Sequence, residues 1–557
     1  MKTFPLYSVK QTRELDARCI DDEQISGYQL MQRAGLAAFR VIQERWPKLN
    51  AVTIVCGTGN NGGDGYVIAK LAHQQNMLVD VVQLGDSERL TPSAKLAFAS
   101  MEDVGVLAKR FLREEKNQTY EFAFTGEIIV DAIFGTGLSS ANETSAGIRA
   151  TSREITGEWQ AAIEAINRSS KPVVAIDIAS GLCAETGAVL NCAVVADVTI
   201  TFIARKLGLY TGDGRAVSGD VKFESLEVSE NVYRQVPTGL QLVSTLAGPL
   251  LSKRPINSHK NTFGHVLVVG GAPSMRGAAQ LAAHAALRVG AGLVSVATHP
   301  SHASLFNLTL PELMVEGVKD ECSLKRMIVN ADVIIVGPGL GTTEWAKMLF
   351  EAVISSELPI VIDADGLSLL AGSSIELEGN LNSNIEPRRK TINSVSRNSW
   401  VLTPHPGEAA RLLETTGHAI QQDRLISAKR IQQKFGGVCV LKGAGTIVQG
   451  VGCHTNSGYN AHAQDEIGVA SYVCPYGNPG MASAGMGDVL AGVIGGLIAQ
   501  SDISKSHLLD NKLLDIAAFA VTLHAQAGDE VANKMGEKGM LASDLIPVMR
   551  ELINQNE

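Results

Sequence analysis

A glycine-rich turn that leads into an apolar stretch is the part of the sequence whose residue types point most directly to chemistry. Residues 478–488 read Asn-Pro-Gly-Met-Ala-Ser-Ala-Gly-Met-Gly-Asp, and Val-Leu-Ala-Gly follows them. Glycines leave backbone N–H groups accessible, and the N-terminus of a helix favours an anion, so this pattern predicts a phosphate site. Asp488 would be a catalytic base beside that phosphate. The alternative is that Asp488 only caps the helix.

A second glycine-rich turn follows a short apolar run at residues 51–56. Gly57, Gly59 and Gly62 have the GxGxxG spacing that dinucleotide-binding proteins place between a strand and a helix. The same turn carries two amides and one carboxylate, which that fingerprint does not predict: Asn60, Asn61 and Asp64. These side chains indicate polar ligation in addition to phosphate binding.

Polar side chains also follow two later apolar runs. They are Asp131, Asp177 and Ser180. Because the carboxyl ends of parallel strands lie at one edge of a sheet, we expect these side chains to converge with Asn61. Oxygen ligands of this kind suit a hard cation better than zinc or copper. For any single aspartate, the alternative is that it caps the segment that follows.

Short runs rich in valine and isoleucine alternate with helical stretches, which is typical of a parallel α/β sheet. The first series of expected strands lies at 51–56, 78–84, 128–134, 173–178 and 198–203. The second series lies at 265–269, 294–297, 333–336, 360–362, 401–403 and 438–441. Residues 1–45 read as helices, because apolar side chains recur there at helical spacing.

The chain is expected to form two domains. Its 557 residues are too many for one ordinary core. The stretch 230–261 contains Pro237, Pro249 and Pro255 and little periodicity, so we place the boundary near residue 235. The sequence therefore predicts an α/β protein with domains at 1–235 and 236–557.

The composition favours an enzyme that acts on small molecules. The net charge of −9 at pH 7 argues against a nucleic-acid surface. No segment offers about 20 uninterrupted apolar residues and the N-terminus lacks a signal-peptide core, so we expect no membrane contact and a cytoplasmic location. The eight cysteines show no CxxC spacing and are expected to be buried free thiols.

Two polar segments, 372–399 and 450–477, are expected to be surface excursions. The second contains His454 and His462, which lack the ligand spacing of a zinc site.

Residues 1–225 resemble the NAD(P)H-hydrate epimerase domain. Four motifs in order carry the resemblance: Gly-Thr-Gly-Asn-Asn-Gly-Gly-Asp-Gly (57–65), Asp-Ala-Ile-Phe-Gly-Thr-Gly-Leu (131–138), Ile-Asp-Ile-Ala-Ser-Gly-Leu (176–182) and Thr-Ile-Thr-Phe-Ile-Ala (199–204). The resemblance implies a Rossmann-like, three-layer α/β/α fold in which Asp177 acts at the epimerised carbon. It also implies a potassium ion bound by Asn61, Asp131 and Ser180. The residues that would hold the hydrated cofactor are Asn60, Asn61, Gly62, Gly63, Asp64, Gly135, Thr136, Gly137, Leu138, Ser139, Ser140, Ala141 and Asp177.

Residues 240–550 resemble the ribokinase-like NAD(P)H-hydrate dehydratase domain, an α/β fold. The resemblance is carried by the motifs at 337–341, 403–408, 442–446 and 478–488, while the absence of GxxxxGK[ST] argues against a P-loop. It implies that Gly339, His405 and Asp488 face the hydrated nicotinamide. Two turns would bind an adenine nucleotide: Lys442, Gly443, Ala444, Gly445, Thr446, Asn478, Pro479, Gly480, Met481, Ala482, Ser483, Ala484, Gly485, Met486 and Gly487.

Together the two resemblances imply a bifunctional repair enzyme for hydrated NADH and NADPH, called NADHX and NADPHX. One domain would interconvert the (6R) and (6S) epimers, and the other would dehydrate the S form. A hydroxyl is a poor leaving group, so a phosphoryl group would be transferred to it with Asp488 as general base, and elimination would restore the ring double bond. The resemblance implies ADP as donor, with Mg²⁺ on the nucleotide and K⁺ in the epimerase domain. The loop residues alone do not separate ADP from ATP.

Other activities stay open at this stage. A small-alcohol kinase shares the second fold and its Gly-Asp base, and would phosphorylate without elimination; the first domain would then be a non-catalytic Rossmann-like binding module. A dehydrogenase would use the first GxGxxG turn, but Asp131 and Asp177 line the crevice of that turn. Such folds commonly form homo-oligomers, which we also expect here.

Overall fold

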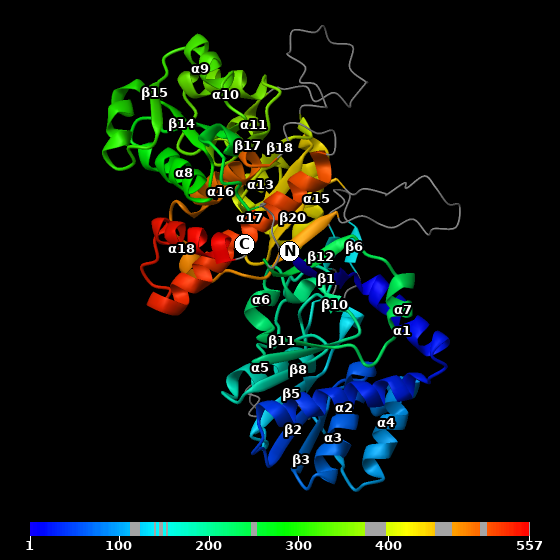
Figure 1. Ribbon diagram of the computed structural model, residues 1–557. Helices are drawn as coiled ribbons and strands as arrows, with labels where there is room; N and C mark the ends of the chain where they lie inside the picture. The colour runs from blue at the N-terminus through cyan, green and yellow to red at the C-terminus, as the bar shows by residue number, and fades with distance from the viewer. Residues whose placement is uncertain are drawn as a thin grey trace, which may run out of the picture. The chain divides into compact units, whose positions relative to one another are not determined.

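The computed structural model (Figure 1) describes residues 1–111, 123–138, 141–143, 149–151, 154–246, 253–373, 397–451, 470–501 and 509–555. They form two compact units, one of Pro5–Thr238 and one of Met1–Phe4 with Gly239–Glu557. We call these the N-terminal unit and the C-terminal unit. Ser139, Ser140, His454, His462 and most of the two polar segments lie outside the described residues.

The N-terminal unit is built on a parallel sheet in the order β11-β9-β8-β5-β2-β3-β4. Its strands are β2 (Ala51–Cys56), β3 (Leu78–Gln83), β4 (Ala108–Arg110), β5 (Ile128–Ala132), β8 (Val173–Ile176), β9 (Val198–Phe202) and β11 (Asp220–Glu224). The chain order reverses between β2 and β5. In open α/β sheets, ligands bind at the carboxyl ends of the strands at such a reversal.

Helices cover both faces of this sheet, because successive strand residues point to opposite sides. Ile54 and Val130 pack in a core with α2, α3 and α4, whereas Val55 and Ile129 pack in a second core with α5. The predicted three-layer α/β/α arrangement is confirmed. The helices are α1 (Val9–Asp22), α2 (Gly27–Arg45), α3 (Asn60–Gln74), α4 (Pro92–Glu102), α5 (Glu158–Arg168), α6 (Gly214–Val217) and α7 (Glu230–Gln235). Shorter elements are β1 (Lys2–Tyr7), β6 (Ala141–Glu143), β7 (Arg149–Thr151), β10 (Arg205–Lys206) and the 3₁₀ helices η1 (Ser87–Arg89), η2 (Thr136–Leu138) and η3 (Leu207–Leu209).

The strands of the C-terminal unit follow the order β12-β21-β20-β19-β18-β17-β16-β13-β14-β15. They pair in parallel except for β20, which is antiparallel to both neighbours. Their bounds are β12 (Leu240–Thr245), β13 (His265–Val269), β14 (Leu293–Thr298), β15 (Met314–Gly317), β16 (Val333–Val336), β17 (Ile360–Ile362), β18 (Trp400–Leu402), β19 (Val438–Leu441), β20 (Thr446–Gln449) and β21 (Ser471–Cys474).

Helix α16 lies in the centre of the C-terminal unit's main core. It packs against α8, α17 and the strands β13 and β16. A Cβ atom on Gly492 would lie 2.2 Å from the carbonyl oxygen of Ala282, so the backbones of α16 and α8 are in contact. This close packing fixes the first turn of α16, which carries Asp488. The helices are η4 (Lys260–Phe263), α8 (Arg276–Arg288), η5 (Pro300–Leu308), α9 (Glu321–Ile328), α10 (Glu344–Ile354), α11 (Asp365–Gly372), α13 (Pro406–Leu412), α14 (Gly417–Gln422), α15 (Arg424–Phe435), η6 (Pro479–Met481), α16 (Met486–Ala499), α17 (Leu509–Met535) and α18 (Ala542–Gln555).

Some expectations from the sequence are wrong. Residues 1–45 are not helical throughout, because Lys2–Tyr7 forms β1, whose Leu6 and Tyr7 pair with β10. The stretch 230–261, for which no element was predicted, contains α7 and β12. Cys322 is exposed rather than buried, while Cys453 lies outside the described residues. None of the described helices combines the length and the apolar character needed to cross a bilayer.

Candidate active sites

The turn after β2 lies at the N-terminus of α3 and requires glycine at two positions. A Cβ atom on Gly57 would lie 2.0 Å from the carbonyl oxygen of Ile133, and one on Gly62 would lie 2.0 Å from that of Gly57. Gly59 is the N-cap of α3 and supplies no side-chain cap. The first N–H groups of the helix are therefore available to an anion.

Asn61 is buried beside the catalytic candidate Asp177. A Cβ atom on Gly135 would lie 3.5 Å from Asn61 Cβ and 3.6 Å from Asp177 Oδ2. Neither Oδ1 nor Nδ2 of Asn61 has a hydrogen-bond partner among the described residues. Leaving a buried amide unpaired costs about 1–3 kcal/mol, so a ligand at this position would satisfy it.

Asp131 and Ser180 are fully buried and bind each other at neighbouring strand ends. Ser180 donates to Asp131 twice, from Oγ to Oδ1 at 2.6 Å and from the backbone N–H to Oδ2 at 2.8 Å. Burial raises the pKa of Asp131 to about 6, although these hydrogen bonds oppose the rise. A hard cation would offset the cost of burying this carboxylate, and the oxygens of Asn61, Asp131 and Ser180 fit potassium as a donor set.

Lys206 holds the carboxylate of Asp177. Asp177 follows β8 with a left-handed φ of 66°, and its Oδ1 accepts a hydrogen bond from the backbone N–H of Phe202 at 3.3 Å. The ammonium group of Lys206 forms an ion pair with the same oxygen. It also donates to Thr201 Oγ1 at 3.0 Å and to the carbonyl oxygen of Phe202 at 2.9 Å. Lys206 is 1 % exposed and Asp177 is 16 % exposed, so the ammonium group is shielded from water while the carboxylate stays partly accessible.

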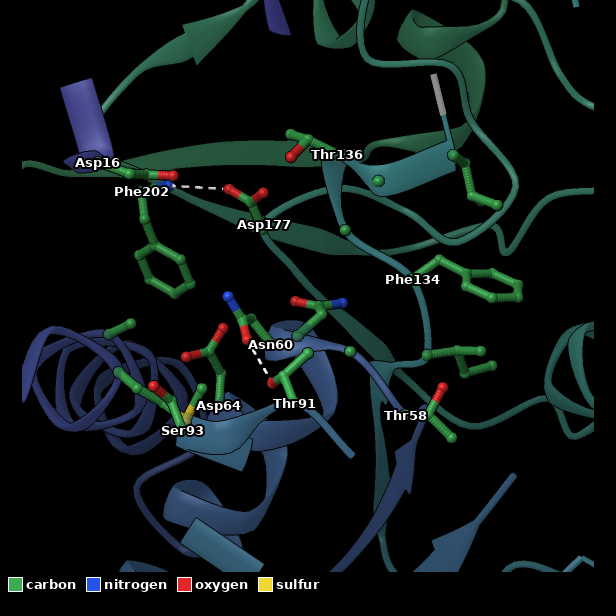
Figure 2. Close-up of a pocket in the computed structure, with 18 of the residues that line it drawn as sticks. Asp16, Thr58, Asn60, Asp64, Thr91, Ser93, Phe134, Thr136, Asp177 and Phe202 are labelled. Carbon is green, nitrogen blue, oxygen red and sulfur yellow. Dashed lines mark hydrogen bonds between the residues drawn. The ribbon is translucent and has the colours of Figure 1, made fainter. Parts of the chain in front are cut away.

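One cavity of about 1210 Å³ in the N-terminal unit is lined by Asn61, Asp177 and Lys206, whereas Asp131 and Ser180 are not among the residues that line it. Figure 2 shows Asp16, Asp64 and Asp177 around the same space. Burial and then the charges of Asp177 and Asp16 raise the pKa of Asp64 well above its usual range, and burial raises the pKa of Asp16 to about 6. Two carboxyl groups in different surroundings therefore line one cavity: Asp177 is paired with Lys206, and Asp64 has a raised pKa. Such a pair is suited to acid–base chemistry.

Most of the residues predicted to hold a hydrated cofactor line this cavity: Asn60, Asn61, Asp64, Gly135, Thr136, Gly137, Leu138 and Asp177. Gly62 and Gly63 are buried within α3, and Ala141 begins β6. Sequence reasoning missed Asp16 and Lys206. A signal existed for Lys206, because it closely follows the fourth family motif at 199–204.

In the C-terminal unit, the turn of residues 478–487 leads directly into α16. Gly485 is the N-cap, with a left-handed φ of 88° and no side-chain cap. The alternative that Asp488 serves as the cap is therefore wrong, since Asp488 lies inside the first turn. Asn478 is held by Asp529, to whose Oδ1 its Nδ2 donates at 2.9 Å. The buried Oγ of Ser483 has no partner among the described residues.

Lys442 and Asp363 form a buried ion pair beneath the first turn of α16. Lys442 Nζ lies 2.6 Å from Asp363 Oδ1, and these side chains are 19 % and 1 % exposed. A Cβ atom on Gly487 would lie 3.0 Å from Lys442 Nζ. Burial and the charge of Asp363 raise the pKa of Asp488 to about 7, against the opposing charge of Lys442. A carboxyl group with this pKa is suited to general-base catalysis near neutral pH.

His405 both caps a helix and reaches the charged cluster. Its Nδ1 accepts from the backbone N–H of Gly407 at 3.0 Å, and its backbone N–H donates to Glu408 at 2.8 Å. Burial and the charge of Lys442 lower the pKa of His405, so the ring is neutral at pH 7. The side chain is still 53 % exposed, which leaves a face for a ligand.

The remaining predicted residues of this unit lie in turns at strand ends. Gly339 has a left-handed φ of 58°, and a Cβ atom there would lie 2.4 Å from the carbonyl oxygen of Met275. Gly443 and Gly445 have φ values of 138° and 64°, and Thr446 Oγ1 closes their turn by donating to the Gly443 carbonyl at 3.0 Å.

Comparisons with known proteins match both units. A family model described as NAD(P)H-hydrate dehydratase matches residues 266–550, and one described as YjeF-related protein N-terminus matches residues 27–208. The chain is 40% identical over 550 residues to the bifunctional NAD(P)H-hydrate repair enzyme Nnr of Coxiella burnetii, covering 99% of both proteins. The chain belongs to the bifunctional NAD(P)H-hydrate repair enzymes. The Escherichia coli member is 38% identical over 531 residues, which is 95% of this chain and 90% of that protein.

A solved structure of an ADP/ATP-dependent NAD(P)H-hydrate dehydratase from Bacillus subtilis, co-crystallised with ATP and Mg²⁺, covers 56% of this chain and 100% of that chain. Its identity is 24% and its TM-score is 0.41. Membership of the repair family confirms the epimerase and dehydratase interpretation of the two domains. It does not favour the small-alcohol kinase with a non-catalytic N-terminal module.

Proposed function

We propose that this family member repairs NADHX and NADPHX in two steps, with residues 1–235 as the epimerase and residues 236–557 as the dehydratase. The observation that carries the proposal is the 40% identity that extends over 99% of both this chain and its Coxiella relative. A similarity of this extent includes both domains, so neither activity depends on a partial match. Each unit also supports its step with an aspartate beside a glycine-rich turn, Asp177 in one and Asp488 in the other.

The epimerase step uses the cavity of the N-terminal unit. The diphosphate of the hydrated cofactor binds at the N-terminus of α3, and its hydrated ring faces Asp177. Asp177, held by Lys206, takes the proton of the substrate hydroxyl as the bond between the hydroxyl-bearing carbon and the ring nitrogen opens, and Asp64 gives a proton to that nitrogen. The reverse proton transfers close the ring on the other face of that carbon and restore both carboxyl groups.

The proposal also includes a potassium ion bound in the N-terminal unit. Asn61, Asp131 and Ser180 would hold the ion, and the ion would supply positive charge at the carboxyl ends of β2 and β5. The orphaned amide of Asn61 and the buried carboxylate of Asp131 support this ligand set. The chemistry of proton transfer is assigned to Asp177 and Asp64 and does not pass through the ion.

The dehydratase step uses Asp488. As Asp488 removes the proton of the substrate hydroxyl, that oxygen bonds to the terminal phosphorus of the nucleotide, and the bond from this phosphorus to the bridging oxygen breaks. The N-terminus of α16 stabilises charge on the transferring group. Phosphate then leaves as a neighbouring ring proton is lost, which restores the double bond.

ADP is the proposed donor and AMP and phosphate are the products. The turns at 442–446 and 478–487 bind the nucleotide, while Gly339 and His405 face the nicotinamide. Mg²⁺ is assigned to the phosphates of the nucleotide. A cytoplasmic location and a homo-oligomeric state stay predictions.

The test follows the near-ultraviolet absorbance of reduced nicotinamide after the full chain is added to purified (6S)-NADHX, (6R)-NADHX or their mixture, with Mg²⁺, K⁺ and either ADP or ATP. We expect reduced nicotinamide to be recovered from both epimers when ADP is the donor. Recovery from the S epimer alone would refute the epimerase assignment. Phosphorylation of a small alcohol without any recovery would refute the dehydratase assignment.

A further inference from the structure

The ammonium group of Lys442 lies among carboxylates of the protein, and its side chain is 19 % exposed. Its ammonium group lies 2.6 Å from Asp363 Oδ1 and 3.9 Å from Glu408 Oε2. Burial alone lowers the pKa of Lys442, but the charges of Asp363, Glu408 and Asp488 outweigh burial and raise it. Lys442 therefore remains a cation, and its charge is paired with carboxylates of the protein.

Three neighbouring strand ends fix this ion pair. Asp363 follows β17 and accepts a second hydrogen bond at the same oxygen from Thr403 Oγ1, which follows β18, at 2.8 Å. Lys442 follows β19, and both polar groups of its backbone are hydrogen-bonded. Its N–H donates to the Pro404 carbonyl oxygen at 2.9 Å, and Arg424 donates to the Lys442 carbonyl oxygen at 3.2 Å. The position of the ammonium group is thus set by the sheet.

The first turn of α16 rests on this pair. A Cβ atom on Gly487 would lie 3.0 Å from Lys442 Nζ and 3.3 Å from Asp363 Oδ2. Any larger residue at position 487 would displace one or the other. Asp488 is the next residue, so the ion pair lies beside the proposed general base.

Every other charged neighbour of Asp488 in the described structure opposes its ionisation. Burial, Asp363, Asp365 and Glu408 raise the pKa of Asp488, and Lys442 lowers it. The charges of Lys442 and Arg411 also act on His405 and Glu408, and the charge of Lys442 acts on His524 on α17. Burial and the charge of Lys442 lower the pKa of His524 to about 4, so this histidine is neutral and offers no second cation.

We propose that Lys442 is a positioning residue for the dehydration step: its ammonium group, fixed by Asp363, is the counter-charge of the Asp488 carboxylate, and the backbone of residues 442–446 rather than the Lys442 side chain faces the nucleotide. This inference rests on the dehydratase activity proposed above. In the reaction, Asp488 takes the hydroxyl proton and Lys442 keeps its own. The lysine acts only through the charge that it places beside the base.

The test is the pH dependence of dehydration by the full chain with Lys442→Met, compared with wild type and with Lys442→Arg. Removing a nearby opposite charge raises a carboxyl pKa by about 1–3 units. The acidic limb of the kcat profile should therefore move up by about one pH unit or more, and kcat at pH 7 should fall about five-fold or more. The KM for ADP should change by less than about two-fold. Lys442→Arg keeps the charge and should keep the wild-type limb.

A nucleotide-binding role of the Lys442 side chain predicts the opposite result. The KM for ADP would then rise about ten-fold or more in Lys442→Met, because a charge-assisted contact to phosphate is lost, and the acidic limb would stay in place. That result overturns the proposal. If the wild-type chain fails to dehydrate (6S)-NADHX both with ADP and with ATP, the function on which the proposal rests is refuted instead.

Lys442→Met leaves Asp363 as a buried unpaired carboxylate, which threatens folding. The fluorescence of Trp400, fully buried in the same unit, reports whether the variant is folded. If it is not, the double variant Lys442→Met/Asp363→Asn removes both charges and keeps the shape. An unchanged KM for ADP in the double variant supports the proposal, and a KM raised about ten-fold overturns it.

Discussion

Asp177→Asn should abolish epimerisation and also destabilise the N-terminal unit, because both effects involve the ion pair with Lys206. The change removes the carboxylate that accepts the proton, which should slow epimerisation by about 100-fold or more. It also leaves the ammonium group of Lys206 buried, at 1 % exposure, without its counter-charge. Thr201 Oγ1 and the Phe202 carbonyl still accept its hydrogen bonds, but they carry no charge to replace that of Asp177.

The loss of stability can be estimated from the burial of Lys206. Removing one partner of a buried ion pair destabilises proteins by about 3–5 kcal/mol. In a unit of this size, each kcal/mol lowers the melting temperature by about 2–4 °C, so the transition of the N-terminal unit should fall by about 6–20 °C. Scanning calorimetry of the full chain measures that shift, and the dehydration of (6S)-NADHX by the same sample shows that the C-terminal unit is intact.

The matched control is the double variant Asp177→Asn/Lys206→Met, which removes both charges at nearly constant volume. It should recover most of the lost melting temperature and none of the epimerase activity, so the coupling between the two positions appears in stability alone. Two results would refute the reasoning. One is an Asp177→Asn protein as stable as wild type, and the other is a double variant that epimerises.

Three further outcomes are expected. The kcat of dehydration should rise with pH through about 7, since Asp488 must be ionised and its pKa is raised to about 7; a flat profile in this range contradicts its role as base. Replacing K⁺ by tetramethylammonium should slow epimerisation and leave dehydration unchanged, and an equal loss of both activities would contradict a potassium site in the N-terminal unit. Gly57→Ala should destabilise the protein by about 1–3 kcal/mol in chemical unfolding, because its Cβ atom would overlap the Ile133 carbonyl at 2.0 Å. Gly59→Ala, with no atom within 4 Å of the added group, should cost less, and equal losses would contradict the contact.

The buried parallel strands could be predicted from the sequence because both of their faces are covered. Such strands read as unbroken runs of valine and isoleucine, and the bounds expected for β13, β16, β17 and β19 are those found. Strands at the margins carry a weaker signal. Lys2–Tyr7 contains Pro5 and alternates in burial, and Leu240–Thr245 lies among prolines, so β1 and β12 were missed.

The candidate site residues could be predicted where they follow a strand, since the carboxyl ends of parallel strands converge whatever the rest of the fold does. Their partners could not be predicted in this way. Lys206 reaches Asp177 across 29 residues, and Lys442 reaches Asp363 across 79. No helical or strand period links positions so far apart, and only the packing of the folded sheet brings them together.

These two lysines have a shared consequence for the chemistry. Burial raises the pKa of a carboxyl group, and both units hold such groups, Asp64 in one and Asp488 in the other. A site that needs a base must therefore supply a positive charge to the carboxylate chosen for that role. In the N-terminal unit Lys206 pairs directly with Asp177, the proposed base, while Asp64, the proposed donor, has a raised pKa. In the C-terminal unit Lys442 pairs with Asp363 and acts on Asp488 from the side, which leaves the base weakly acidic and able to release its proton near pH 7. In the proposed mechanism each unit thus places one lysine near its base: Lys206 is in direct contact with Asp177, and Lys442 is paired with Asp363 beside the first turn of the helix that carries Asp488.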